Sequence, residues 1–297
     1  MPTAQVNGVK LNYTQLSHKG SGAAEDLVML HGLAANMAFW LMEYGQHFAE
    51  RFRVTLFDLR GHGRSETTES GYTPDNMAAD FRGLLDVLEI RKAHAVAHSF
   101  GGIAALKTAC ADPARFSSLV IADTHINLGR KQAKVSTWET GEKVQKILDN
   151  CGIWLDVKDP YFGYHLITEI ARFRRDGREI PEDLFPWVKH ILDGNNTRTA
   201  EKWLSLMEDT QAEKELTSDD ELSEDVLKNI SCPFLALYGE KSQAVASGRI
   251  LASVLPRAEF VSVPDSGHFF PRSQPDFVKS ACEKFWSGHV AQQRKAG

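Results

Sequence analysis

Cysteine is scarce in this chain of 297 residues: there are only four, widely scattered and without a C-x-x-C pair. A disulfide framework and a zinc site are therefore not expected, and free thiols in a reducing compartment are the simplest expectation. No apolar stretch approaches the ~20 residues of a membrane helix, and the first residues lack a charged segment followed by an apolar one. We therefore expect a cytoplasmic protein.

An excess of positive charge is also lacking. The chain carries 34 Lys and Arg against 39 Asp and Glu, a formal net charge of −5. This balance argues against nucleic acid or an anionic membrane as a partner. The densest basic cluster, Arg172–Arg175, is followed by acidic residues and is interpreted as a solvated helix face. With 42% hydrophobic residues, the chain is long enough for one large domain or for a core with an inserted subdomain.

What the chain does contain is a series of short, continuous apolar runs separated by helical patterns, which is typical of parallel strands buried on both faces. The runs are Leu27–Leu30, Val54–Phe57, Ala93–Ala97, Leu119–Ala122, Phe234–Tyr238 and Phe260–Val263. Before them, residues 6–15 alternate around Asn7-Gly8, which predicts an antiparallel hairpin. Between them, Thr73-Pro74 begins a helix that runs to about Leu88. We expect an α/β fold with a mostly parallel, doubly wound central sheet and helices on both faces.

The strand pattern disappears after about His125 and returns only at Phe234. Amphipathic helical patterns replace it, over residues 137–150, 161–175, 181–192 and 198–207. We therefore predict a helical cap, residues 125–229, inserted into a core formed by residues 1–124 and 230–297. Ligands bind at the carboxyl edge of such sheets, so the cap is expected there. Its aromatic residues belong either to its own core or to an apolar pocket wall. The candidates for the wall are Trp138, Trp154, Tyr161 and Trp187.

A serine follows the run Ala93–Ala97, in the string Ala97-His98-Ser99-Phe100-Gly101-Gly102. Small residues around a serine between a strand and a helix indicate a nucleophile elbow, a strained turn that exposes the serine Oγ. Alone the string is weak evidence, since A-x-S-x-G arises by chance in about one chain in ten of this length. Far downstream, Asp265-Ser266-Gly267-His268 supplies a histidine that can accept the serine proton. The amide of Phe100, at the start of the next helix, is a donor for an oxyanion.

These features together resemble the α/β-hydrolase superfamily, in its branch with a helical cap. The resemblance rests on Leu30-His31-Gly32-Leu33, on the loop at residues 58–65, on the elbow, and on Ser266-Gly267-His268. It implies an α/β-hydrolase fold with Ser99 as nucleophile, His268 as base, and the Leu33 amide as the second oxyanion donor. It further implies that Asp58, Arg60 and His62 brace loops without doing chemistry. His31, His98 and His268 are expected to gather near the site, with His31 against the substrate.

The acid that should hold His268 is not where the resemblance predicts it. The expected G-x-x-D is here Gly239-Glu240-Lys241-Ser242, which places a serine at the position of the aspartate. Asp123, at the end of the strand Leu119–Ala122, is the favoured replacement, because the ends of neighbouring parallel strands meet at one edge of the sheet. Glu240, Asp265 and a dyad without any acid are the alternatives.

The leading interpretation is a serine hydrolase that cleaves a carboxylic ester or thioester of a fairly apolar acyl group through an acyl-enzyme on Ser99. One alternative is a C–C bond hydrolase of a β- or vinylogous diketone, in which Arg172, Arg174 or Arg175 turns inward to meet substrate charge. Another is a ligand-binding protein with little turnover. We expect a small-molecule substrate, no organic cofactor and no metal. The oligomeric state stays open, a homodimer through the tryptophan-rich cap included.

Overall fold

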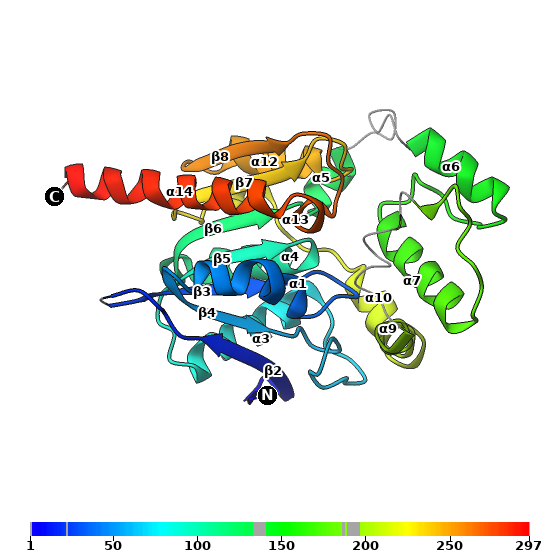
Figure 1. Cartoon of the computed structure of the whole chain (residues 1–297), viewed down its shortest axis with the longest axis horizontal. Helices are drawn as coiled ribbons and strands as arrows, with labels where there is room; N and C mark the ends of the chain where they lie inside the picture. Colours follow the sequence, from blue (N-terminus) through cyan, green and yellow to red (C-terminus); the bar gives the residue numbers. More distant parts are fainter. Residues whose placement is uncertain (1, 22, 133–140, 186–187, 189–196, 297) are drawn as a thin grey trace.

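The computed structural model describes residues 2–21, 23–132, 141–185, 188 and 197–296 (Figure 1). Eight strands form one sheet in the order β1-β2-β4-β3-β5-β6-β7-β8. They are β1 (Thr3–Val6), β2 (Val9–Leu16), β3 (Glu25–Leu30), β4 (Phe52–Phe57), β5 (Ala93–His98), β6 (Phe116–Ala122), β7 (Phe234–Gly239) and β8 (Ala258–Val263). The two pairings of β2 are antiparallel, and all pairings from β4 to β8 are parallel. The predicted mostly parallel sheet and its six apolar runs are confirmed.

The hairpin at the amino end has the predicted turn. Asn7 and Gly8 connect β1 to β2, with Val6 paired to Val9. Both turn residues have positive φ, 43° and 73°. Asn-Gly suits such a two-residue turn because both residues tolerate the left-handed region. The hairpin adds two antiparallel strands to the edge of the parallel sheet, beside β4.

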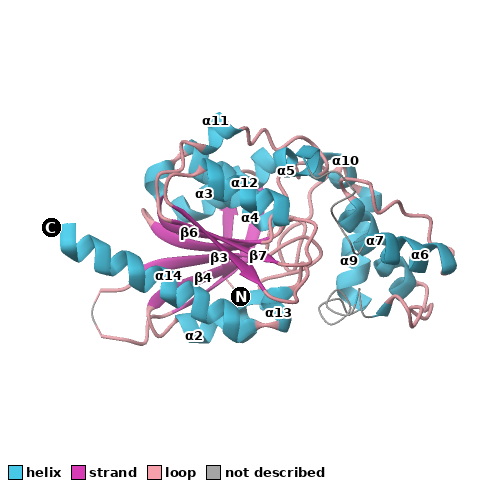
Figure 2. Ribbon diagram, turned by 90° about the horizontal axis from the view of Figure 1, so that it is seen from above, coloured by secondary structure: helices cyan, strands magenta, loops and turns pink. Residues whose placement is uncertain are grey.

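Helices cover both faces of the sheet (Figure 2). On one face lie α3 (Pro74–Val87), α4 (Phe100–Ala111) and α12 (Val245–Val254); on the other lie α2 (Gln46–Phe48), α13 (Phe270–Ser273) and α14 (Pro275–Ala296). The shorter elements between them are α1 (Ala38–Trp40), the π-helical turn η1 (Leu41–Gly45) and the 3-10 turn η2 (Pro113–Arg115). The helix predicted after Thr73 is confirmed: the Thr73 hydroxyl accepts the Asn76 amide at 3.2 Å and Pro74 fills the first position.

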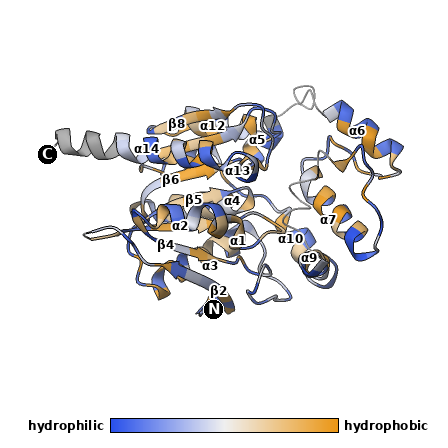
Figure 3. Ribbon diagram, viewed as in Figure 1, coloured by the Kyte–Doolittle hydropathy of each residue, from blue (hydrophilic) through white to orange (hydrophobic). Residues whose placement is uncertain are grey.

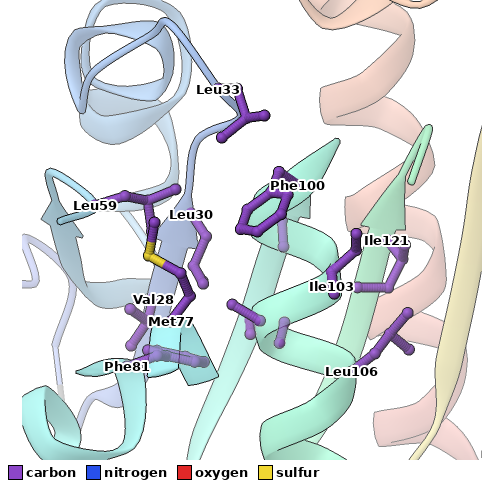
Figure 4. Packing of buried hydrophobic residues seen from close by; sticks show 14 of the residues in the cluster. Val28, Leu30, Leu33, Leu59, Met77, Phe81, Phe100, Ile103, Leu106 and Ile121 are labelled. Carbon is purple, nitrogen blue, oxygen red and sulfur yellow. The ribbon is translucent and has the colours of Figure 1, made fainter. Parts of the chain in front are cut away.

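Alternate residues of each central strand belong to different core layers. Along β3, Val28 and Leu30 pack with the α3 and α4 side, whereas Leu27 and Met29 pack with the α14 side. Figure 4 shows the first layer, where Phe81 of α3 and Leu106 of α4 approach the strands. Both layers are apolar, which explains why these strands appear in the sequence as continuous hydrophobic runs instead of alternating ones (Figure 3).

No strand lies between β6 and β7 among the described residues. This segment contains α5 (Asn127–Gln132), α6 (Gly141–Asn150), α7 (Phe162–Arg175), α9 (Thr197–Asp209), α10 (Ala212–Leu216) and α11 (Glu224–Leu227). The helices α6, α7 and α9 stand together beyond the core (Figure 1), and α6 and α7 share an apolar cluster that includes Leu148 and Phe162. Half of the predicted helix 181–192 and residues 137–140 of the first cap helix lie outside the described residues.

The ends of the predicted cap segment pack on the core. At its start, the Ile126 amide donates to Ser247 Oγ of α12 at 3.2 Å. Near its end, Lys107 of α4 donates to the carbonyl of Asp220 at 2.8 Å. Hydrogen bonds therefore join both ends of the predicted segment 125–229 to the core.

Asp58 and Arg60, on the loop after β4, hold other loops in place. Asp58 accepts the Met37 amide at 2.7 Å and the Asn12 side chain at 2.7 Å. Arg60 forms a buried ion pair with Asp80 at 2.7 Å. Burial lowers the pKa of His62, which follows on the same loop, to about 3, so this side chain is neutral at pH 7. These contacts agree with the expected bracing role.

Lys202 of α9 attaches the cap to this same loop. Its ammonium group donates to the carbonyls of Gly63 and Ser65 at 2.8 and 2.9 Å. We expect Lys202→Met to lower the free energy of unfolding by about 2 kcal/mol, because two charge-assisted hydrogen bonds are lost. Urea denaturation measures this, with Lys146→Met on the exposed side of α6 as the control. Equal stability of the two variants would contradict the attachment.

Candidate active site

Ser99 lies at the turn between β5 and α4. Its φ of 54° and ψ of −126° lie outside the ordinary regions for a residue with a side chain. The surrounding backbone leaves little space: a Cβ added to Gly32 would meet the Ser99 Cβ at 2.8 Å. The Thr124 hydroxyl donates to the Ser99 carbonyl at 2.9 Å. The turn thus has the strained strand-to-helix geometry expected of a nucleophile elbow and is held from both sides.

Two further side chains from neighbouring strand ends meet Ser99. His268, after β8, has its Nε2 atom 3.0 Å from Ser99 Oγ. Its Nδ1 atom lies 2.8 Å from Oδ2 of Asp123, which is fully buried at the end of β6. The order hydroxyl, imidazole, carboxylate allows His268 to accept the serine proton while Asp123 fixes the ring tautomer.

Asp123 is the acid that touches His268, and the alternatives are directed elsewhere. Asp265 is 85% exposed in its side chain and pairs with Lys241 at 2.9 Å. Glu240 accepts the Asp265 amide at 2.9 Å. Ser242, where the aspartate was expected, donates a short hydrogen bond to the same Oδ2 that holds His268. The Gly239 amide donates to Oδ1 at 2.9 Å, so both carboxylate oxygens are occupied.

Backbone strain gathers around this site. Ala34, Ser99, Asp123 and Asp265 all have φ between 52° and 54°. Such conformations cost about 1–3 kcal/mol each in residues other than glycine, and they persist where the surrounding structure enforces them. Ser99, Asp123 and Asp265 each follow a strand of the sheet, so the strained residues lie at its carboxyl edge.

The two expected oxyanion donors flank Ser99. Phe100 is the first residue of α4, where an amide has no carbonyl in the preceding turn of the helix. Leu33 follows Gly32, whose position against Ser99 brings the loop after β3 next to the hydroxyl. Helix α4 adds the positive end of its dipole at the same point. A developing negative charge beside Ser99 Oγ would be stabilised there.

A cavity of about 880 Å³ opens above these residues, between core and cap. Its volume lies within the range of about 300–1,000 Å³ for small-molecule sites. Ser99 and His268 line its floor, and apolar side chains of α6 and α7 line the opposite wall, namely Val144, Phe162, Leu166 and Ile167. Phe162 and Leu166 are four residues apart on α7, so they lie on the same face of the helix. The sequence alone did not show which face of α7 meets the core.

The expected substrate-binding residues that the structure describes do not meet substrate in the cavity. His31 is fully buried; its Nδ1 atom faces the Gly32 carbonyl at 2.7 Å and its Nε2 accepts the Leu59 amide at 3.1 Å, so it joins loops instead of meeting substrate. Trp154 is 96% exposed on the cap surface, and neither it nor Tyr161 lines the cavity. Trp138 and Trp187 lie outside the described residues.

The cap arginines considered for substrate charge also face away from the cavity. Arg172 pairs with Glu169 at 3.3 Å, and Arg175 pairs with Glu208 at 3.0 Å. Neither they nor Arg174 line the cavity. The basic cluster is therefore engaged on the surface of α7, in agreement with a solvated helix face.

His98 supports the loop that carries His268. Its ring is buried and stacks on Phe39 with centroids 4.8 Å apart, and its Nε2–H donates to the His268 carbonyl at 2.9 Å. Burial holds the pKa of His98 well below its usual value, so the ring is neutral. A neutral ring here keeps a second positive charge away from His268.

Buried neutral histidines make the fold sensitive to acid. Burial lowers the pKa of His31, His62, His98 and His125 below 6.5. Below pH 6.5 the unfolded chain therefore binds protons that the native chain does not, and stability falls as the pH falls. Each such histidine contributes a slope of about 1.4 kcal/mol per pH unit.

We expect urea denaturation between pH 6.5 and 5 to show this decline in the free energy of unfolding. Because His62→Gln removes one such histidine, we expect it to reduce the slope by about 1.4 kcal/mol per pH unit. Equal slopes for the variant and the unsubstituted chain would contradict the assignment of a neutral buried His62.

Among the described residues, no group of three or more His, Cys, Asp or Glu side chains is placed to hold a metal ion. Within the same part of the chain, no helix has the length and apolar character needed to span a bilayer.

The sheet order, the elbow and the serine–histidine–aspartate arrangement define an α/β-hydrolase architecture. The sequence matches the model of the alpha/beta hydrolase family over residues 27–281, and the chain belongs to this family.

Its relatives carry several different hydrolase names. The chain is 27% identical over 270 residues to a putative carbamate hydrolase, RutD, of Pantoea ananatis, covering 89% of each chain. It is 30% identical over 131 residues to 3-oxoadipate enol-lactonase 2 of Acinetobacter baylyi, covering 44% of this chain and 48% of the relative.

Among solved structures, the enol-lactonase of Burkholderia xenovorans LB400 superposes with a TM-score of 0.67 at 22% identity, covering 96% of this chain and 100% of that one. A putative lipase of Acinetobacter baumannii AYE reaches a TM-score of 0.70 at 18% identity, covering 98% and 92%. At these identities the structures establish a common fold, and the family assignment establishes a hydrolase.

Proposed function

We propose that this chain is a serine hydrolase that cleaves a carboxylic ester or thioester of a fairly apolar acyl group. The observation that carries the proposal is the line of contacts from Ser99 Oγ to His268 and on to the buried carboxylate of Asp123, at the floor of a cavity with an apolar wall. A nucleophile, a base, an orienting acid and two backbone donors are the parts that acyl transfer requires.

The reaction follows from these positions. Ser99 Oγ attacks the substrate carbonyl and its proton passes to His268 Nε2, while the amides of Leu33 and Phe100 stabilise the oxyanion. As the carbonyl re-forms, His268 returns the proton to the leaving alcohol or thiol, and the acyl group stays on Ser99. A water molecule then attacks the acyl-enzyme, gives its proton to His268, and the carboxylic acid leaves as Ser99 recovers its proton.

The apolar wall favours an aliphatic or aromatic acyl group of small-molecule size. Val144, Leu166 and Ile167 offer no charge to such a group, and burial of its methylenes contributes about 0.8 kcal/mol each. Carbamate and lactone hydrolysis, named for the relatives, are also transfers of an acyl group to water, and the same residues could serve them. Hydrolysis assays therefore have to identify the leaving group.

The test is hydrolysis of a p-nitrophenyl ester series of increasing chain length, with an acyl thioester, a lactone and a carbamate beside it. We expect turnover with an optimum at medium chain length, and a burst of p-nitrophenol stoichiometric with enzyme where deacylation is slow. A burst without later turnover would favour the ligand-binding alternative. Turnover of a diketone but of no ester would favour the C–C hydrolase.

A further inference from the structure

One wall of the cavity carries an arginine that forms no ion pair with an acid in the described part of the chain. Arg130 of α5 lines the cavity. No Asp or Glu of the described residues lies within ion-pair distance of its guanidinium. The group is instead held in place by neutral partners. One terminal nitrogen donates to the Pro160 carbonyl, the other lies 3.4 Å from Tyr164 Oη, and the group sits 4.8 Å from the centre of the Tyr161 ring. Tyr161 therefore supports Arg130 instead of lining the pocket.

Arg130 also has a donor without an acceptor. Its Nε atom is buried and, among the described residues, has no hydrogen-bond partner. The nearby carboxylate of Asp220 is already engaged, since it accepts the amides of Asn127 at 2.7 Å and Leu222 at 3.1 Å. A buried N–H without an acceptor is costly unless something else supplies an oxygen.

His125, which lines the same cavity, also has a polar atom without a partner in the described part of the chain. Its Nε2 is buried and lacks a partner within the described ranges, and the residue lines the cavity beside Arg130. Burial holds the pKa of this ring well below its usual value, and the charges of Arg130 and His268 lower it further.

We propose that Arg130 and His125 form a carboxylate-binding subsite, so that the natural substrate carries a free carboxylate at the end remote from its scissile ester bond. For binding, both side chains turn so that the Nε–H of Arg130 and the Nε2–H tautomer of His125, which have almost no accessible surface in this structure, each donate to a carboxylate oxygen. This inference rests on the proposed function. It refines the acyl group: an aliphatic chain against Val144, Leu166 and Ile167, ending in an acid. Half-esters of aliphatic dicarboxylic acids have this form.

The experiment compares two esters of equal chain length, p-nitrophenyl hydrogen adipate and p-nitrophenyl hexanoate. We expect the ratio of their kcat/KM values to fall by about 100-fold in Arg130→Gln, mainly through KM of the adipate ester, since one partner of a buried charge contact is lost. Arg130→Lys should retain part of the ratio, and His125→Phe should lower it by about 10-fold. Arg172→Gln, a matched change in an arginine engaged by Glu169, should leave it unchanged.

The ratio of the two kcat/KM values is taken within each variant, so a lower concentration of folded enzyme changes both values equally and leaves the ratio unchanged. An unchanged ratio in Arg130→Gln, with both esters still hydrolysed, would overturn the subsite and leave the proposed function intact. Failure of the unsubstituted enzyme to hydrolyse either ester would overturn the proposed function instead. The subsite is then decided by adipate alone: a rise in melting temperature that Arg130→Gln abolishes supports it, and no rise overturns it.

Discussion

Replacing Asp123 by asparagine is expected to lower kcat by about 10⁴-fold with little change in stability. The carboxylate accepts the Nδ1–H of His268 on Oδ2 and the Gly239 amide on Oδ1. An asparagine that keeps its oxygen toward Gly239 turns its NH₂ group toward His268. That group donates to Nδ1 and forces the proton onto Nε2, and His268 can then no longer accept the proton of Ser99.

The matched controls make the same change at the other two candidate acids. Asp265→Asn and Glu240→Gln remove carboxylates near the His268 loop that do not contact the ring, and turnover is expected to stay within about twofold of the unsubstituted enzyme. Steady-state kinetics of all three variants, with thermal melting to verify folding, assigns the acid. A full rate in Asp123→Asn, or a collapse in either control, would show that the acid is not Asp123.

A second variant tests whether the acid can return to the position that the family resemblance predicted. Ser242 already donates to Oδ2 of Asp123, the oxygen that holds His268. A carboxylate introduced there in the double variant Asp123→Asn/Ser242→Asp therefore starts close to the imidazole. We expect it to recover part of the lost kcat, whereas Ser242→Ala in the Asp123→Asn background should recover none.

The sequence predicted the central sheet, the helix after Thr73 and the amino-terminal hairpin, because local sequence patterns encode these elements. Continuous apolar runs appear wherever a strand is covered on both faces, and Thr73-Pro74 and Asn7-Gly8 define their helix start and turn through their own side chains and backbone. Ser99 and Asp123 could also be found, since each directly follows an apolar run. Their closeness in space follows from the rule that neighbouring parallel strands end at the same edge of the sheet.

The cap was less predictable because its helices can meet the core by more than one face. Trp154 has the composition of a pocket residue and is exposed, whereas Phe162 was not singled out and lines the cavity. Arg130 was missed for the same reason: it gives no local signal, and its role in the cavity wall depends on how Tyr161 and Tyr164 pack against it. Contacts between segments far apart in the chain decide these positions.

Replacing Ser99 is expected to have the largest effect on activity, a loss of about 10⁶-fold in kcat for Ser99→Ala. The hydroxyl is 3.0 Å from His268 Nε2, and without it no acyl-enzyme can form. A serine-directed phosphonate should label the unsubstituted chain once, at Ser99, as read by intact-mass measurement, and should leave Ser99→Ala unlabelled. Labelling that persists in the variant would place the nucleophile elsewhere.

Ser99→Gly separates chemistry from stability at the same position. The residue has a φ of 54°, which glycine adopts without penalty and serine does not. We expect Ser99→Gly to be as inactive as Ser99→Ala but more stable than it by about 1 kcal/mol, measured by urea denaturation. Such a result would show that the turn stores strain in order to expose the hydroxyl. Equal stability of the two variants would mean that the surrounding loops do not enforce the positive φ at this position.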